Sequence, residues 1–355
     1  MSVFVGGLRL SQLFYEEAVK PILAALSPSL AYAAALIGGG SEILGYDTPL
    51  STDHDWGPWL VLFLAERDYE TDARRIDRAL QEQLPLTFHG YPTRFALSHD
   101  APSALPQHRV EVRTARAFFA ARLGFDPSVA LRPADWLTVP EQTLLELTAG
   151  AVYHNGPGEL AALRDRLAYY PRDIWLYLMA AQWRRIAQQE AFVGRAGDAG
   201  DDLGSRLLAA AIVHDLMRLC FFIERRYAPY GKWFGTAFAR LACGVALGPL
   251  FARVLRAEEW QTREAALAEA YAAIIRLHNG LGMTPPIEAA VSPYYTRPYV
   301  VIHAGHVADA LVDAITDLAV RRLPAYGGID QVSDSTNLLG HVEVREKLRV
   351  LYASP

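Results

Sequence analysis

The sequence predicts a protein of the α+β class, with strands and helices in its first part and helices alone in its second. Short apolar runs typical of buried strands occur mainly before about residue 125. After about residue 133, apolar residues recur at helical spacing over long segments. Asp126-Pro127 and Arg132-Pro133 supply chain breakers between the two parts. We therefore expect two domains, 1–130 and 131–355.

Local patterns predict the elements of each domain in order. The amphipathic stretch 8–27 predicts a helix that is kinked at Pro21. Apolar and aromatic runs predict strands, and charged amphipathic segments predict helices. The first domain is expected to contain strands at Tyr32–Ile37, His54–Ala65, Thr93–Leu97 and His108–Thr114, and helices at Tyr69–Leu84 and Thr114–Leu123. The second is expected to contain helices at 140–150, 158–169, 172–193, 203–227, 257–280 and 304–322, with a loop at Gly194–Asp202.

Composition restricts the class of protein. The chain has 355 residues, of which 52% are hydrophobic and 21% charged, which is typical of a globular protein with a large core. A net charge of −5 does not favour a nucleic-acid partner. The two cysteines, Cys220 and Cys243, are expected to be buried free thiols in a reducing compartment. The most apolar later stretch, Leu207–Ile223, contains three polar or charged residues, and the N-terminus lacks a basic leader, so we expect a cytoplasmic protein without a membrane span.

The motif richest in chemical groups is a glycine turn followed by two aspartates. Gly39, Gly40 and Ser41 end an apolar run, and eleven residues separate Ser41 from Asp53-His54-Asp55. The turn would offer backbone N–H groups and a hydroxyl to phosphate oxygens, because glycine has no Cβ to block their approach. If the second strand begins at the aspartates, Asp53 and Asp55 point to the same side. Paired carboxylates of this kind suit Mg²⁺ or Mn²⁺ together with substrate phosphates.

A third carboxylate is available on the predicted strand His108–Thr114. Glu111 alternates with apolar neighbours there, and an acid in that setting needs a partner such as a metal ion or an attacking hydroxyl. Arg113, two residues further along the same predicted strand, would lie within reach of a phosphate of a bound nucleotide. The plainer interpretation is that Ser51-Thr52-Asp53 forms only a turn or helix cap.

The spacing of Gly40-Ser41 and Asp53-x-Asp55 resembles the signature of the nucleotidyltransferase (polymerase-beta-like) superfamily. Most of the chain also resembles the bacterial family called domain of unknown function 4037. The stretches that match this family are Gly45–Thr48 through Asp53–Pro58, Tyr227–Thr236 and Asp330–Thr336. The resemblance implies a small mixed-sheet nucleotidyltransferase domain followed by an all-helical substrate-binding domain, similar to kanamycin-type nucleotidyltransferases.

The superfamily resemblance also implies roles for particular residues. Gly40 and Ser41 would contact phosphate, Asp53 and Asp55 would bind metal, and Glu111 would be the third ligand or the general base. The implied activity is transfer of a nucleoside monophosphate from an NTP, with ATP as the expected donor, to a small-molecule hydroxyl. Two alternatives stay open: a nucleotide-binding regulatory protein without turnover, and a nucleotidyltransferase that modifies protein or RNA. A homodimer is also left open.

Several residues of the second domain have two interpretations. Lys232, with Tyr227, Tyr230 and Trp233, could contact phosphate or stack on a base, or this segment could be a corner between helices. The aromatic stretch Tyr294–Tyr299 could line an acceptor pocket or only cover the core. The remaining pair considered, His303 and His306, lacks a third ligand in the sequence, so zinc is not expected.

Overall fold

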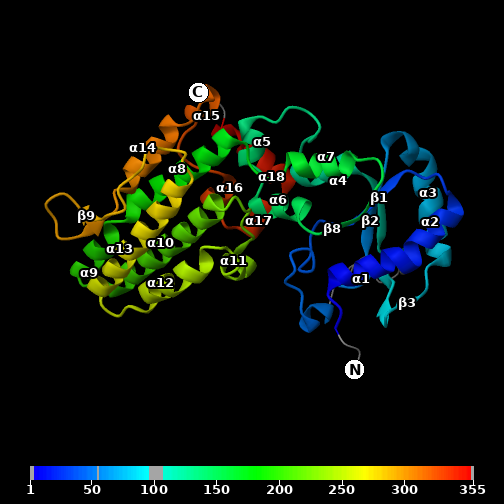
Figure 1. Cartoon of the computed structure of the whole chain (residues 1–355), viewed down its shortest axis with the longest axis horizontal. Helices are drawn as coiled ribbons and strands as arrows, with labels where there is room; N and C mark the ends of the chain where they lie inside the picture. Colours follow the sequence, from blue (N-terminus) through cyan, green and yellow to red (C-terminus); the bar gives the residue numbers. More distant parts are fainter. Residues whose placement is uncertain (1–3, 54–55, 96–106, 353–355) are drawn as a thin grey trace. The chain divides into compact units, whose positions relative to one another are not determined.

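The computed structural model describes residues 4–53, 56–95 and 107–352. It divides into two compact units: unit 1 comprises Met1–Ala130 and Thr143–Ala168, and unit 2 comprises Leu131–Gln142 and Tyr169–Pro355. The predicted α+β class is confirmed, because a four-stranded sheet lies in unit 1 and unit 2 is mainly helical (Figure 1).

Unit 1 contains all four strands of the main sheet and the helices that cover it. Its helical elements are α1 (Gly7–Phe14), the π-helical turn η1 (Tyr15–Val19), α2 (Lys20–Leu26), the 3₁₀ helix η2 (Pro49–Asp53), α3 (Glu66–Gln83), α4 (Ala115–Leu123) and α7 (Glu159–Arg166). Its strands are β1 (Tyr32–Leu36), β2 (Leu60–Leu64), β3 (Thr87–Phe88), β4 (Tyr91–Pro92), β5 (Arg94–Phe95), β6 (Gln107–His108), β7 (Val110–Thr114) and β8 (Ala151–Asn155). Helix α6 (Glu141–Thr148) includes residues of both units.

The main sheet has the strand order β7-β2-β1-β8 and mixed direction. Strand β1 is antiparallel to both β2 and β8, whereas β2 and β7 are parallel. Every residue of β1 and β2 is buried, which explains why both strands appear in the sequence as continuous apolar runs.

The two faces of this sheet pack against different helices. Leu60, Leu62 and Leu64 belong to a core cluster that also contains residues of α1, α2 and α3. Phe63 points to the opposite face, where its ring meets Phe118 of α4 edge-on at 5.2 Å. The segment 8–27 forms the predicted helix as α1, η1 and α2, and the π-helical turn directly precedes the turn that contains proline.

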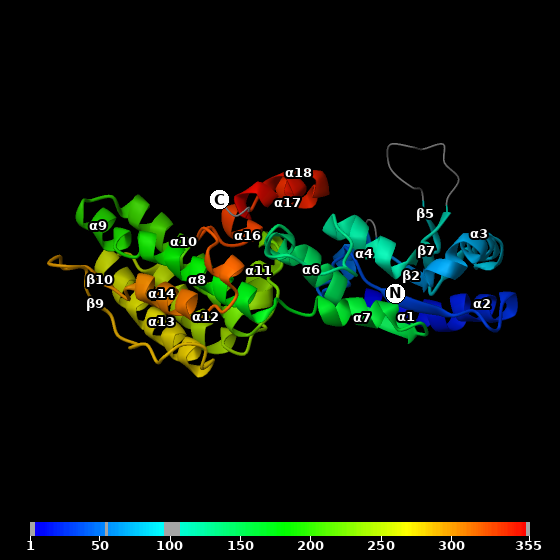
Figure 2. The ribbon, with the colours of Figure 1, turned by 90° about the horizontal axis from the view of Figure 1, so that it is seen from above.

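Unit 2 is a set of helices in which α8, α10 and α13 lie side by side (Figures 1 and 2). Its helices are α5 (Pro133–Leu137), α8 (Arg172–Gln189), α9 (Phe192–Asp198), α10 (Asp202–Ile223), α11 (Gly231–Phe238), α12 (Gly244–Arg256), α13 (Trp260–Gly280), α14 (Ala304–Asp313), α15 (Leu318–Arg321), α16 (Ile329–Val332), α17 (Thr336–Gly340), α18 (Val342–Lys347) and the 3₁₀ helix η3 (Leu348–Tyr352). A short hairpin of β9 (Ser292–Pro293) and β10 (Val300–Val301) precedes α14. Within the residues that the model describes, no helix is long and apolar enough to cross a lipid bilayer.

Several sequence predictions about elements were wrong. Helix α12 was not predicted, and the helix expected at 304–322 is divided into α14 and α15. Three further differences have a clear physical reason. The strand expected from His54 begins at Leu60, because Gly57 has a φ of +149° and Pro58 lacks an N–H for the ladder. Strand β8 was missed because its residues are half-buried or exposed and form no apolar run. The loop expected from Gly194 overlaps α9, where Gly197 allows close packing: a Cβ there would lie 2.2 Å from Trp260.

Candidate functional site

One edge of the unit 1 sheet gathers the segments that the sequence singled out. Because β1 is antiparallel to β2, with Ala35 opposite Val61, the turn after β1 lies at the edge where β2 begins. Because β2 and β7 are parallel, with Val61 opposite Glu111, β7 also begins at this edge. The glycine turn, the segment that precedes β2 and Glu111 therefore converge there.

Two glycines of the turn have backbone conformations that other residues rarely adopt. Gly38 has a φ of +111° and Gly40 a φ of +141°. A Cβ on Gly40 would lie 2.7–2.9 Å from the carboxylate atoms of Glu42, so the turn encloses this acid closely. Residues 41–45 form a turn and not a helix, so anion binding here would rest on the backbone N–H groups of the turn without a helix dipole. Gly39 and Gly40 are exposed and Ser41 is half-buried, so phosphate oxygens can reach the backbone of the turn.

Two tryptophans hold the segment before β2 against the glycine turn. The indole Nε1 of Trp59 donates to Glu42 at 2.8 Å, and that of Trp56 donates to Asp47 at 3.2 Å. Asp47 also accepts the backbone N–H of Gly7 at 2.7 Å. Burial raises the pKa of the Glu42 carboxyl, which the indole hydrogen bond partly offsets. Since Trp56 directly follows the second aspartate of the motif, this tether fixes where that part of the chain returns to the sheet.

The predicted metal ligands are only partly within the described chain. Asp53 is the exposed last residue of the 3₁₀ helix η2, so the prediction that it begins a strand was wrong. Asp55 lies outside the described residues. In the ranges 4–53, 56–95 and 107–352, no three His, Cys, Asp or Glu side chains group closely enough to hold a metal ion. The donor chemistry of Asp53 and Glu111 nevertheless fits a hard divalent cation, since both offer carboxylate oxygens with access to solvent.

Glu111 is present at the sheet edge but is engaged by an arginine. Arg113 donates from Nε to Glu111 Oε1 at 2.6 Å, and the two side chains are 51% and 39% exposed. This hydrogen bond is the main cause that raises the pKa of the Arg113 guanidinium. Glu111 is therefore held at the sheet edge by a direct contact with a cation.

Arg122 lies beside the glycine turn and is a candidate site residue that the sequence analysis missed. Its guanidinium lies 3.5 Å from the centre of the Phe118 ring, and its Nη1 donates to the Phe118 carbonyl at 3.2 Å. A Cβ on Gly38 would lie 3.4 Å from its Nη2, so the guanidinium lies directly behind the glycine turn. Burial lowers its pKa, while Glu111 and Glu146 act in the opposite direction. The available signal was the spacing of four residues from Phe118 on a predicted helix.

Lys232 and its aromatic neighbours lie in unit 2. Lys232 is exposed at the start of α11, with its Nζ 4.9 Å from the centre of the Trp233 ring. Tyr227 is buried and packs against the rings of Tyr169 and Tyr170 at 5.2 and 5.1 Å. The corner interpretation therefore describes Tyr227, while Lys232 remains accessible to a ligand.

A buried ion pair fixes this corner. Arg218 of α10 donates to Glu141 at 2.6 Å, and Glu141 also accepts the N–H of Ala228 at 2.8 Å. Asp330 accepts the N–H of Glu141 at 2.9 Å, which caps the start of α6. Burial raises the pKa of Glu141 to about 7, against the lowering effect of Arg218.

Comparison with known proteins gives one family match. Residues 136–234 match the model of a family described as Domain of unknown function (DUF4037). No curated protein and no solved structure matches the chain. The match supports the resemblance to this family over the segment that contains Tyr227–Phe234 and lies outside the segment that contains the glycine turn and the two aspartates.

Proposed function

We propose that the chain is a metal-dependent nucleotidyltransferase, which moves a nucleoside monophosphate from an NTP, with ATP as the expected donor, to a hydroxyl of a small-molecule acceptor. One observation supports this most strongly: the strand registers bring the glycine turn, the segment before β2 and Glu111 to one edge of the sheet. An exposed glycine turn beside carboxylates is the combination that a triphosphate with a divalent cation requires.

The proposed reaction assigns a task to each group at this edge. The acceptor oxygen attacks the α-phosphorus, the bond to the β-phosphate bridge breaks, and pyrophosphate leaves. Glu111 takes the acceptor proton as general base. The N–H groups of Gly39 and Gly40, with the hydroxyl of Ser41, hold phosphate oxygens.

Asp53, Asp55 and Glu111 would hold Mg²⁺ or Mn²⁺, which would neutralise charge on the phosphates. Arg113 contacts the Glu111 carboxylate directly and would orient it before substrate binds. Arg122, behind the glycine turn, adds a positive charge on the side of the sheet where Phe118 lies.

A transfer assay tests this proposal. Wild type, the double variant Asp53→Asn with Asp55→Asn, Glu111→Gln and the control Glu70→Gln would be incubated with α-labelled NTPs, Mg²⁺ and a panel of hydroxylated small molecules. Glu70 is an exposed acid of α3 and serves as a matched control. Label should appear on an acceptor with wild type and the control, and Glu111→Gln should slow transfer about 10²–10⁴-fold. Undiminished transfer by the double aspartate variant would refute the assignment.

One observation favours a second candidate, a nucleotide-binding regulatory protein without turnover. The 2.6 Å ion pair with Arg113 occupies an oxygen of Glu111 that the reaction would need. For that candidate, NTP would bind with Mg²⁺ but no label would reach any acceptor. The assay above separates the two when it is combined with a direct measurement of NTP binding.

A further inference from the structure

The hairpin β9–β10 and the start of α14 bring together a serine and a histidine that are eleven residues apart. Ser292 Oγ lies 2.7 Å from His303 Nε2. The pair lies in unit 2, where the hairpin projects from the end at which α9 is found (Figures 1 and 2). Ser292 is opposite Val301 in the hairpin, so the turn of the chain after β10 brings the imidazole back to the serine.

The backbone of His303 is held in an unfavourable conformation. Its φ of +54° and ψ of +50° are left-handed, a region that residues with a Cβ adopt at a cost of roughly 1–2 kcal/mol. Such conformations persist only when neighbouring contacts enforce them, and they are common at functional sites.

The enforcing group is a buried carboxylate at the end of α8. Glu190 accepts the N–H of Ile302 at 3.0 Å and that of Ala304 at 3.2 Å, so it holds the chain on both sides of His303. Glu190 is only 6% exposed, and few alternative partners are therefore open to it. These hydrogen bonds hold the backbone from which the His303 side chain extends.

The surroundings leave the serine open to a reactant. Ser292 is exposed, and His303 is half-buried with the ring of His306 stacked against it at 5.8 Å. The exposed Tyr295 and the ring of Tyr294 lie together at 4.8 Å on the same hairpin, where they offer an aromatic surface.

We propose that Ser292 and His303 form a nucleophile and general-base pair that performs acyl transfer on esters with an aromatic group. A short hydroxyl–imidazole contact is the arrangement by which proteins activate serine. In the tautomer that carries its proton on Nδ1, His303 Nε2 accepts the hydroxyl hydrogen of Ser292. This inference is independent of the nucleotidyltransferase proposal, since it uses other residues.

The proposed reaction transfers the acyl group of the ester to water, which is the second substrate. Ser292 Oγ attacks the ester carbonyl carbon, and its proton passes to His303 Nε2. The carbon–oxygen bond to the leaving alcohol breaks, and the alcohol takes that proton. Water then attacks the acyl-serine, which releases the carboxylic acid and restores the hydroxyl.

A fluorophosphonate probe tests the pair on the full-length protein. Reaction with Ser292 would form an oxygen–phosphorus bond, break the phosphorus–fluorine bond and release the serine proton with fluoride. Labelled sites would be identified by peptide mass spectrometry. Ser128 is an internal control, because it is an exposed serine whose hydroxyl donates to the Asp126 carboxylate at 2.6 Å but has no imidazole there.

Two variants of His303 remove the imidazole, which is the proposed base, and can keep the left-handed backbone conformation at this position. His303→Asn is chosen because asparagine tolerates the left-handed region, His303→Gly is the second variant of this kind, and His341→Asn, at an exposed histidine, is the control. We expect label on Ser292 and not on Ser128, a fall of the order of 10² in rate for His303→Asn, and no change for His341→Asn. Labelling of Ser292 no faster than that of Ser128 would overturn the proposal. A fall of less than tenfold in both His303 variants would also overturn it.

Discussion

Replacement of Arg218 by methionine tests whether the buried ion pair with Glu141 stabilises unit 2. The two side chains are 10% and 3% exposed and meet at 2.6 Å, so water cannot replace the lost partner. Removing one member of a buried pair costs about 3–5 kcal/mol, because it leaves an uncompensated charge. Methionine keeps most of the apolar stem of arginine, which limits the loss of packing.

The loss of stability caused by Arg218→Met should be larger at high pH than at low pH. The pKa of Glu141 in the folded chain is about 7, raised from 4.5, so the folded state binds this proton more tightly than the unfolded state. Its contribution to stability is therefore fully present below about pH 4.5 and is lost as pH rises through about 7. Because Arg218 lowers this pKa, its removal should raise the pKa further and enlarge the loss above pH 7.

Urea unfolding, followed by tryptophan fluorescence and circular dichroism, measures these effects at two pH values. We expect Arg218→Met to lose about 3–5 kcal/mol at pH 8. At pH 5.5, where Glu141 is protonated, the loss should be only about 1–2 kcal/mol, the value of one hydrogen bond. The double variant Arg218→Met with Glu141→Gln should recover part of the loss at pH 8. A loss below about 1 kcal/mol at pH 8, or an equal loss at both pH values, would refute this reasoning.

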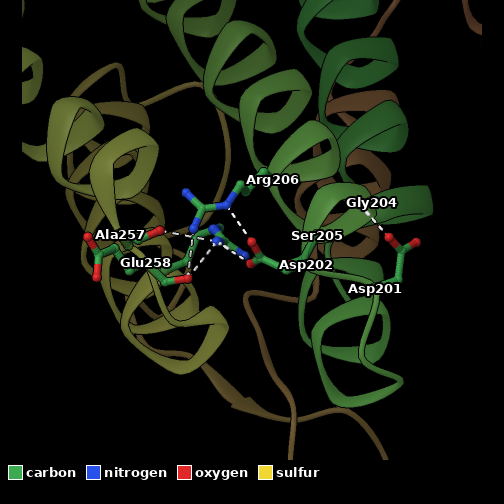
Figure 3. Close-up of polar contacts among 8 residues, drawn as sticks. Asp201, Asp202, Gly204, Ser205, Arg206, Ala257 and Glu258 are labelled. Carbon is green, nitrogen blue, oxygen red and sulfur yellow. Dashed lines mark hydrogen bonds and ion pairs between the residues drawn. The ribbon is translucent and has the colours of Figure 1, made fainter.

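Three further predictions concern substitutions at single positions. Gly40→Ala should abolish NTP binding and lower stability by about 1–3 kcal/mol in thermal unfolding, whereas Gly45→Ala, with open space around its Cβ, should cost only about 1 kcal/mol and keep binding. Arg263→Met should lower the free energy of unfolding in urea by about 3–5 kcal/mol, because the Arg263 side chain is 1% exposed and donates hydrogen bonds to four groups. The neighbouring Arg206 side chain is 39% exposed, so Arg206→Met should cost less than about 1 kcal/mol (Figure 3). If Arg122 contacts phosphate, Arg122→Gln should weaken NTP binding about tenfold or more in calorimetry, and an unchanged affinity would exclude that contact.

Burial explains which elements could be predicted from the sequence. Strand β1 is buried throughout and α3 has a strongly amphipathic pattern, so each was predicted close to its position. Strand β2 is also buried throughout, so its existence and its end were predicted, although its start was not. Strand β8 was missed because exposed and half-buried residues give it no apolar run. Helix α9 was missed because its glycines, which favour turns in isolation, serve close packing against Trp260. Tertiary contacts decided these cases, and single-sequence patterns do not report such contacts.

The candidate site was predictable in its residue types but not in its arrangement. The turn at Gly40 could be predicted because glycine is needed where φ is positive. The contact of Trp59 with Glu42 depends on how two segments pack, which the sequence did not determine. Arg113 and Glu111 are two residues apart on β7 and share one face of that strand, so their contact is local. Arg122 comes to the glycine turn through the packing of α4 on the sheet, so its spacing from Phe118 was not enough to identify it.

The most direct test of the central claim is calorimetric titration of a non-hydrolysable ATP analogue into the full-length protein with and without Mg²⁺. Wild type should bind the analogue only when Mg²⁺ is present. The double variant Asp53→Asn with Asp55→Asn should lose this binding while its thermal unfolding stays unchanged, since Asp53 is exposed at the end of η2. Tight binding that depends on Mg²⁺ and survives in the double variant would contradict the claim that these aspartates form a nucleotide and metal site.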